Sequence, residues 1–109
     1  MPVHKFGIMG TAPGPGERYD CFEPEKYGCI TVDDELLLPL LSELKRVSCY
    51  WHSLDRPNPG LAYYGITLIP PESLGEAARI IQKDKRLGGL LSLLSEAGRE
   101  NKFVIHFGI

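Results

Sequence analysis

The chain has 109 residues, of which 43% are hydrophobic and 24% are charged, and its formal net charge is −2 at pH 7. These values predict that residues 1–109 form a single domain, and the elements described below make it an α+β domain. The small negative charge argues against nucleic acid as a partner, because proteins that bind it neutralise phosphates with Lys and Arg. No apolar run approaches the roughly 20 residues that span a bilayer, and the N-terminus lacks a signal-peptide pattern. We therefore expect a cytoplasmic protein with no membrane partner.

The N-terminal part predicts two short strands separated by a long loop. Residues 4–9 (HKFGIM) alternate weakly and end at a glycine, as strands often do. Residues 10–25 (GTAPGPGERYDCFEPE) are rich in Gly and Pro, which favour turns and interrupt regular structure. Residues 27–32 (YGCITV) form a short β-branched run that is typical of a strand. The loop is long for a compact domain and is a candidate surface loop or lid.

A helix is predicted after the second strand. Asp33 and Asp34 are candidate caps, because Asp side chains accept hydrogen bonds from the free amides at a helix start. Pro39 interrupts the pattern, so the helix either begins near Pro39 or begins at Asp34 and kinks. The apolar stripe at helical spacing consists of Leu37, Leu40, Leu41 and Leu44.

The middle of the chain predicts a hairpin. Residues 47–54 (VSCYWHSL) and 61–69 (LAYYGITLI) are aromatic and β-branched runs, and the DRPNPG between them has strong turn chemistry.

The C-terminal part predicts two helices and a final strand. Apolar residues recur at helical spacing over 74–81 and again over 87–97. Gly88 and Gly89 lower helix propensity by about 1 kcal/mol each, which favours two helices over one. In residues 102–109 (KFVIHFGI), Phe103, Ile105 and Phe107 alternate with polar or smaller residues, as in a strand with one strongly apolar face.

The order of these elements is β-α-β-β-α-α-β after an extra N-terminal strand. This is the order of a ferredoxin-like split βαβ sandwich, in which an antiparallel sheet carries helices on one face. In that fold the strands over 27–32 and 61–69 are the two central ones, and the long Gly/Pro loop lies outside the sheet. Another α+β arrangement of the same elements remains open.

A sheet of this kind leaves one face bare, and strand alternation predicts which side chains lie there. If Phe103, Ile105 and Phe107 face the helices, His106 faces the open side. If Cys49 and Trp51 face the helices, Tyr50 and His52 face the open side, and Tyr64 or its neighbour Tyr63 joins them. His4 joins this group only if the N-terminal strand pairs beside the last one.

These residues are the candidate site. His52 and His106 are candidate catalytic residues, because two nearby imidazoles can act as general acid and base or bind a metal. Tyr50 and Tyr64 are candidate ligand-binding residues that could stack on a planar ligand or fill a dimer contact. Arg18, at the end of the Gly-rich loop, is a candidate for meeting an anion.

No motif for a cofactor, a metal or a phosphate is present, so we expect none. The Gly-rich segment fits neither G-x-G-x-x-G nor the P-loop spacing. Cys21, Cys29 and Cys49 are an odd number without paired spacing, which indicates free thiols rather than disulfides or a zinc site.

The sequence therefore favours a non-enzymatic, homo-oligomeric binding or interaction module, which associates through the open sheet face or an edge strand and could also bind a small molecule. One alternative is a small enzyme with a His/Tyr site on the open face or in a dimer cavity. A second alternative is an inhibitor or immunity-type protein that binds a protein partner.

Overall fold

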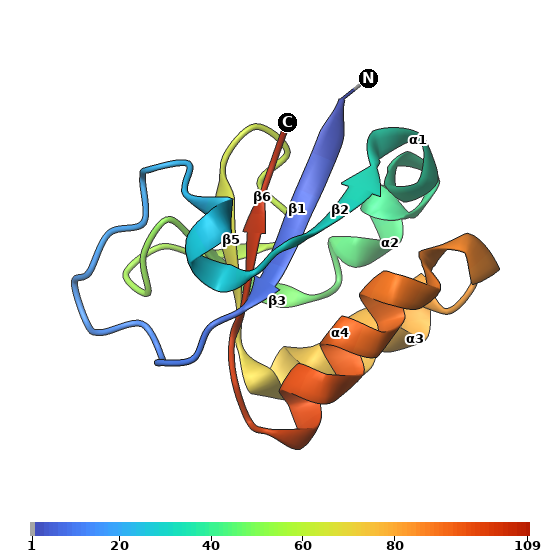
Figure 1. Ribbon diagram of the computed structural model, residues 1–109. Coiled ribbons are helices and arrows are strands. Elements are labelled where there is room, and N and C mark those ends of the chain that lie inside the picture. Colours follow the sequence, from blue (N-terminus) through green and yellow to red (C-terminus); the bar gives the residue numbers. More distant parts are fainter. Residues whose placement is uncertain (1) are drawn as a thin grey trace.

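A computed structural model describes residues 2–109 and contains an antiparallel sheet in the order β2-β1-β6-β5-β3-β4 (Figure 1). The element types are mixed α and β, as the sequence predicts. The six strands are β1 (Val3–Ile8), β2 (Ile30–Asp33), β3 (Ser48–Trp51), β4 (Pro57–Pro59), β5 (Ile66–Ile69) and β6 (Val104–Phe107).

The helices form one layer against the sheet, with α3 and α4 packed on each other (Figure 1). The α-helices are α1 (Asp34–Leu37), α2 (Leu41–Leu44), α3 (Leu74–Ile81) and α4 (Gly88–Arg99). Short 3-10 turns are η1 (Pro24–Tyr27), η2 (Leu38–Leu40), η3 (Pro71–Ser73) and η4 (Lys85–Leu87). None of the helices formed by residues 2–109 is long and apolar enough to cross a membrane.

The ferredoxin-like order is not confirmed, because the N-terminal strand lies inside the sheet. β1 pairs with both β2 and β6. The strand predicted over 27–32 is consequently an edge strand (β2), whereas the ferredoxin order makes it central. Burial explains the interior position of β1: His4 and Phe6 are 0% and 2% exposed, so this strand needs covered neighbours on both sides.

The predicted hairpin contains a third strand. The turn segment pairs with β3 as β4, with Ser48 opposite Pro59 and Tyr50 opposite Pro57. Residues 61–65 form a loop rather than the start of a strand, and β5 begins at Ile66. Proline is compatible with β4 because this strand lies at the edge of the sheet.

The helix after β2 begins at Asp34 and is interrupted at Pro39, which is one of the two predicted alternatives. α1 gives way to the 3-10 turn η2 at Leu38, and α2 resumes at Leu41. The proline lacks the N–H that a continuous helix would need. The predicted leucine stripe still faces the core, since Leu37, Leu40 and Leu44 are buried.

The second face of the sheet is not bare. Ile105 and Phe107, expected under the helices, belong instead to a second apolar cluster on the opposite face, where each is 1% exposed. Tyr19 and Tyr27, from the predicted long loop and η1, pack against this cluster. Figure 1 shows the segment after β1 on the side of the sheet away from α3 and α4.

This arrangement inverts the predicted orientation of the last strand. Val104 belongs to the helix-side core, so alternation turns His106 to the helix side as well. For β3 the prediction is confirmed for two residues: Cys49 belongs to the helix-side core, and Tyr50 packs against the second cluster.

Close approach of the loop to β1 depends on Gly7. A Cβ at this position would lie 2.7 Å from the Tyr27 Cβ and 2.8 Å from the Cys29 Sγ. We predict that Gly7→Ala lowers the free energy of unfolding in urea by about 1–3 kcal/mol through overpacking. Gly88→Ala is the matched control, because a Cβ there meets nothing within 4 Å and should leave stability equal or slightly higher. Equal stability of the two variants would contradict the close packing of this segment.

Candidate functional site

Four buried side chains form a continuous hydrogen-bonded chain across the sheet. His106 Nε2 on β6 lies 2.9 Å from His4 Nδ1 on β1, and His4 Nε2 lies 2.8 Å from Asp34 Oδ1 at the start of α1. At the other end, His106 Nδ1 lies 3.1 Å from Thr67 Oγ1 on β5. Tyr63 donates its hydroxyl to the second oxygen of Asp34, at 2.8 Å.

One set of proton positions satisfies every hydrogen bond in this chain. Thr67 Oγ1 accepts the Ala62 N–H at 2.8 Å, so the Thr67 hydroxyl is free to donate to His106 Nδ1. His106 Nε2–H then donates to His4 Nδ1, and His4 Nε2–H donates to the Asp34 carboxylate. His106 is neutral in this arrangement. In residues 2–109 no buried side-chain nitrogen or oxygen lacks a partner.

Electrostatics favour the same protonation pattern. The hydrogen bond from His4, with a further one from Tyr63, holds the pKa of Asp34 below its usual value. Burial, together with the neighbouring His4 ring, lowers the pKa of His106 well below 6.5. Both imidazole rings are 0% exposed, so a substrate cannot reach them. This chain of side chains therefore links the start of α1 to β1, β6 and β5.

Part of this hydrogen-bonded network could be predicted from the sequence. His4 was expected to join His106 only if the first strand paired beside the last one. β1 does pair with β6. Asp34, interpreted as a helix cap, binds His4 and Tyr63 instead. Thr67 was missed, because a threonine within a strand gives no signal beyond β propensity.

A second location gathers candidate residues at the surface. A cleft of about 300 Å³ lies where the long loop, the residues after β3 and the C-terminal segment meet. We call it the His52 cleft. Its lining residues are Asp20, Phe22, His52, Tyr64, Gly65, Ile66, Phe107, Gly108 and Ile109.

The polar part of the His52 cleft is held by the long loop. Arg18 donates to both Asp20 oxygens, at 2.8 and 3.2 Å, and lowers the pKa of that carboxyl, with a smaller effect from His52. His52 Nδ1 lies 3.0 Å from Asp20 Oδ1 and 3.1 Å from the Tyr19 carbonyl oxygen. Two acceptors beside Nδ1 mean that this nitrogen carries the proton.

His52 adopts a backbone conformation that is uncommon outside glycine, with φ of 67°. Gly65 makes room for its ring, since a Cβ on Gly65 would lie 2.7 Å from His52 Nε2. His52 Nε2 also lies 3.4 Å from the Ile66 amide. The unprotonated nitrogen therefore faces the main chain of residues 65–66 rather than open solvent.

The apolar part of the His52 cleft is exposed. Tyr64 is 81% exposed, Phe22 64% and Ile109 37%. Among the large hydrophobic side chains that are exposed in residues 2–109, Leu38 is the one that lies outside this cleft. Such residues are normally scattered singly over a surface, so their concentration around one hollow is informative.

The five predicted site residues are divided between these locations. His52 and Tyr64 line the cleft, and Arg18 reaches it through Asp20. Tyr50 lies on the same face of the sheet but packs against the second apolar cluster. His106 points to the helix side, so the structure does not bring the two candidate histidines together.

Two of the three thiols are poor nucleophiles because of their burial. Burial raises the pKa of Cys29 to about 11 and that of Cys49 to about 12, so neither supplies a thiolate at neutral pH. Within residues 2–109, no three His, Cys, Asp or Glu side chains are grouped so that they could hold a metal ion.

Comparison with known proteins assigns the chain to no class. No protein-family model matches it, and neither a curated protein nor a solved structure does. Inferences about function therefore rest on the geometry described above.

Burial of His106 predicts how the free energy of unfolding depends on pH. Below pH 6.5 the unfolded chain binds a proton on His106 that the folded protein excludes, so stability falls with decreasing pH from 6.5 toward the lower folded pKa. We expect this residue to account for a loss of up to about 1.4 kcal/mol per pH unit in that window. The measurement is urea unfolding at about pH 7.5, 6.5 and 5.5.

His106→Gln is the comparison variant for this measurement. It should be less stable at neutral pH but lose less stability than the wild type on acidification. Parallel pH profiles for the two proteins would show that His106 is not kept neutral by the fold.

Proposed function

We propose that this protein is a non-enzymatic interaction module that forms a homodimer through the His52 cleft. The observation that carries the proposal is the gathering of Phe22, Tyr64 and Ile109, all exposed, around one hollow. Exposed apolar patches rimmed by polar groups are typical of protein contacts, and aromatic residues are enriched there.

A second copy of the chain suits this surface because the surface carries both a projection and a hollow. A twofold interface uses the same patch on both subunits, so the patch must be complementary to itself. Tyr64, at 81% exposure, is a projection beside a hollow of about 300 Å³. Each subunit can insert its aromatic side chain into the hollow of the other.

The polar side chains of the His52 cleft can fix the orientation of one subunit relative to the other. Asp20 is ionised, half-exposed and held in place by Arg18. A buried tyrosine hydroxyl needs a hydrogen-bond partner, and a carboxylate is a strong acceptor. The Tyr64 hydroxyl of a second copy would find that acceptor in Asp20.

The geometry supports binding better than catalysis. A general base at His52 would need its free nitrogen to face a substrate, but Nε2 faces the Gly65–Ile66 main chain. The rest of the second sheet face offers less support for a dimer contact, because Ile105 is 1% exposed and is already covered there. An inhibitor or immunity-type role would use the same exposed cleft with a different protein as occupant.

We predict that Tyr64→Ser weakens dimerisation by about tenfold or more, because a central aromatic residue carries much of the binding energy of an interface. Sedimentation equilibrium over a range of micromolar concentrations measures the dissociation constant. The wild type should be dimeric and the variant largely monomeric.

Leu38→Ser is the matched control, because Leu38 is 53% exposed and lies on η2, outside the cleft. Its dissociation constant should equal that of the wild type. A wild-type protein that stays monomeric at these concentrations overturns the dimer proposal, and equal effects of the two substitutions overturn the assignment of the interface.

A further inference from the structure

The two edges of the sheet differ in what they offer to another strand. At the β4 edge, Gly60 donates its N–H to the Val47 carbonyl at 2.9 Å, so alternation turns the nitrogens of Pro57 and Pro59 outward. Proline nitrogens carry no hydrogen, and such an edge cannot donate to an incoming strand.

The β2 edge is open. Asp34 donates its N–H to the Pro2 carbonyl at 3.1 Å, so Val32 and Ile30 also direct their main-chain groups toward β1. Alternation then turns the N–H and C=O of Thr31 and the N–H of Asp33 away from the sheet. In residues 2–109 the sheet ends at β2, and both residues are exposed.

A groove runs along this edge, between β2 and α4. One hollow of about 240 Å³ is lined by Thr31, Val32, Leu36, Arg86 and Leu90 among others. A second hollow of about 420 Å³ includes Leu93 and shares Ile30 and Gly89 with the first. We call the two together the β2–α4 groove.

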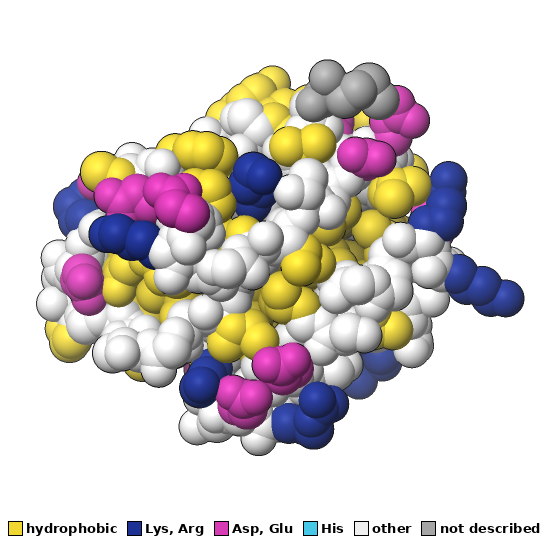
Figure 2. Space-filling view, in the orientation of Figure 1, with side chains coloured by type: hydrophobic (Ala, Val, Ile, Leu, Met, Phe, Trp, Pro, Cys, Tyr) yellow, Lys and Arg dark blue, Asp and Glu magenta, His cyan; other side chains and the backbone are white. Residues whose placement is uncertain are grey.

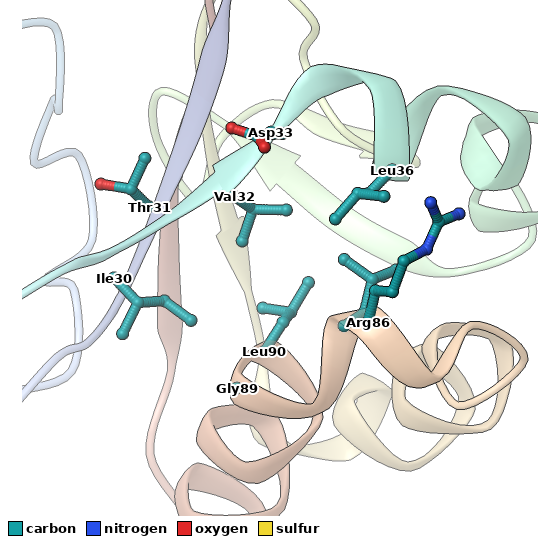
Figure 3. A pocket seen from close by; sticks show the side chains of 9 residues that line it. Ile30, Thr31, Val32, Asp33, Leu36, Arg86, Gly89 and Leu90 are labelled. Carbon is teal, nitrogen blue, oxygen red and sulfur yellow. The ribbon is translucent and has the colours of Figure 1, made fainter.

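The floor of the β2–α4 groove is apolar. Figure 3 shows Val32, Leu36 and Leu90 pointing into the space between strand and helix, with Arg86 at its margin. Figure 2 shows hydrophobic side chains exposed in the same region of the surface. Gly89 keeps the helix side of the groove open, because it has no side chain.

We propose that the β2–α4 groove binds an extended segment of another protein, which adds to the sheet beside β2. Its main chain would pair with Thr31 and Asp33, and alternate aliphatic side chains would enter the groove. Strand addition of this kind combines main-chain hydrogen bonds with side-chain pockets spaced two residues apart.

The same observations argue against a second copy as the occupant. The β2 strand of a second copy would have to place its own apolar side chains in the groove. Val32 is already 6% exposed beneath the helices of its own subunit, so it is not free to do so. The occupant must be a strand with uncommitted aliphatic side chains, and the groove shares no residue with the His52 cleft.

Gly89 and Gly88 provide a matched pair of variants. A Cβ on either residue meets nothing within 4 Å, so the backbone leaves space for a side chain at both positions. Only Gly89 lines the groove. Gly89→Leu therefore fills the groove, whereas Gly88→Leu makes the same change one residue earlier on α4.

The experiment uses the full chain and a phage-displayed library of linear peptides of roughly ten residues, about the length of a long strand. Selected peptides are synthesised and titrated by calorimetry against the wild type and both variants. We expect peptides with aliphatic residues at alternate positions, binding at least about tenfold more weakly to Gly89→Leu and equally well to Gly88→Leu. The Thr31 and Asp33 amides should exchange more slowly with solvent when a peptide is bound.

Three outcomes would overturn the proposal. They are the absence of any selected peptide, peptides whose affinity is unaffected by Gly89→Leu, and unchanged exchange at Thr31 and Asp33. Sedimentation equilibrium of Gly89→Leu tests whether the occupant of the groove is a second copy of the chain. If this variant is a monomer where the wild type is a dimer, the groove holds a second copy, whereas the effect of Tyr64→Ser tests the dimer at the His52 cleft separately.

Discussion

The hydrogen-bonded chain from Asp34 through His4 and His106 to Thr67 connects the first turn of α1 to three adjacent strands. Buried polar groups are costly unless every one is paired, so a network that is complete in one arrangement penalises all others. A shift of β1 by one residue would turn both His4 and Phe6 to the opposite face. The network therefore specifies the register of β1, and with it the unusual position of the N-terminal strand inside the sheet.

Much of the element order could be predicted from local pattern, and the strand order could not. The irregularity at Pro39 and the final strand follow from proline chemistry and spacing, whereas the helix start at Asp34 was one of two predicted alternatives. Which strand lies beside β1 depends on contacts between residues 4 and 106. These residues are 102 positions apart, so the pattern of neighbouring residues gives no information about such contacts. Alternation also says which residues share a face, but not which face the helices cover. In β6 the helices cover the face that carries Val104, although Phe107 on the opposite face is the larger side chain.

The long Gly/Pro loop explains why part of the candidate site was predictable. The loop covers the second sheet face, where Tyr19 donates its N–H to the His52 carbonyl at 2.7 Å. This contact brings Asp20 and Phe22 to the cleft that His52 and Tyr64 line, and Arg18 reaches the cleft through Asp20. Their residue types suggested a site, but the partners Asp20 and Ile109 gave no signal, because a surface carboxylate and a terminal isoleucine are ordinary in any chain.

The two prolines of β4 have a consequence for assembly beyond any single contact. Fibrous aggregates grow when each molecule offers one sheet edge to the next and leaves a competent edge behind. In this protein the β4 edge presents Pro57 and Pro59, which donate no hydrogen bonds, so the β4 edge of one molecule is a poor partner for the β2 edge of the next. Stacking of molecules from β2 to β4 is therefore disfavoured at every step. The chain can expose a strand edge without seeding its own polymerisation.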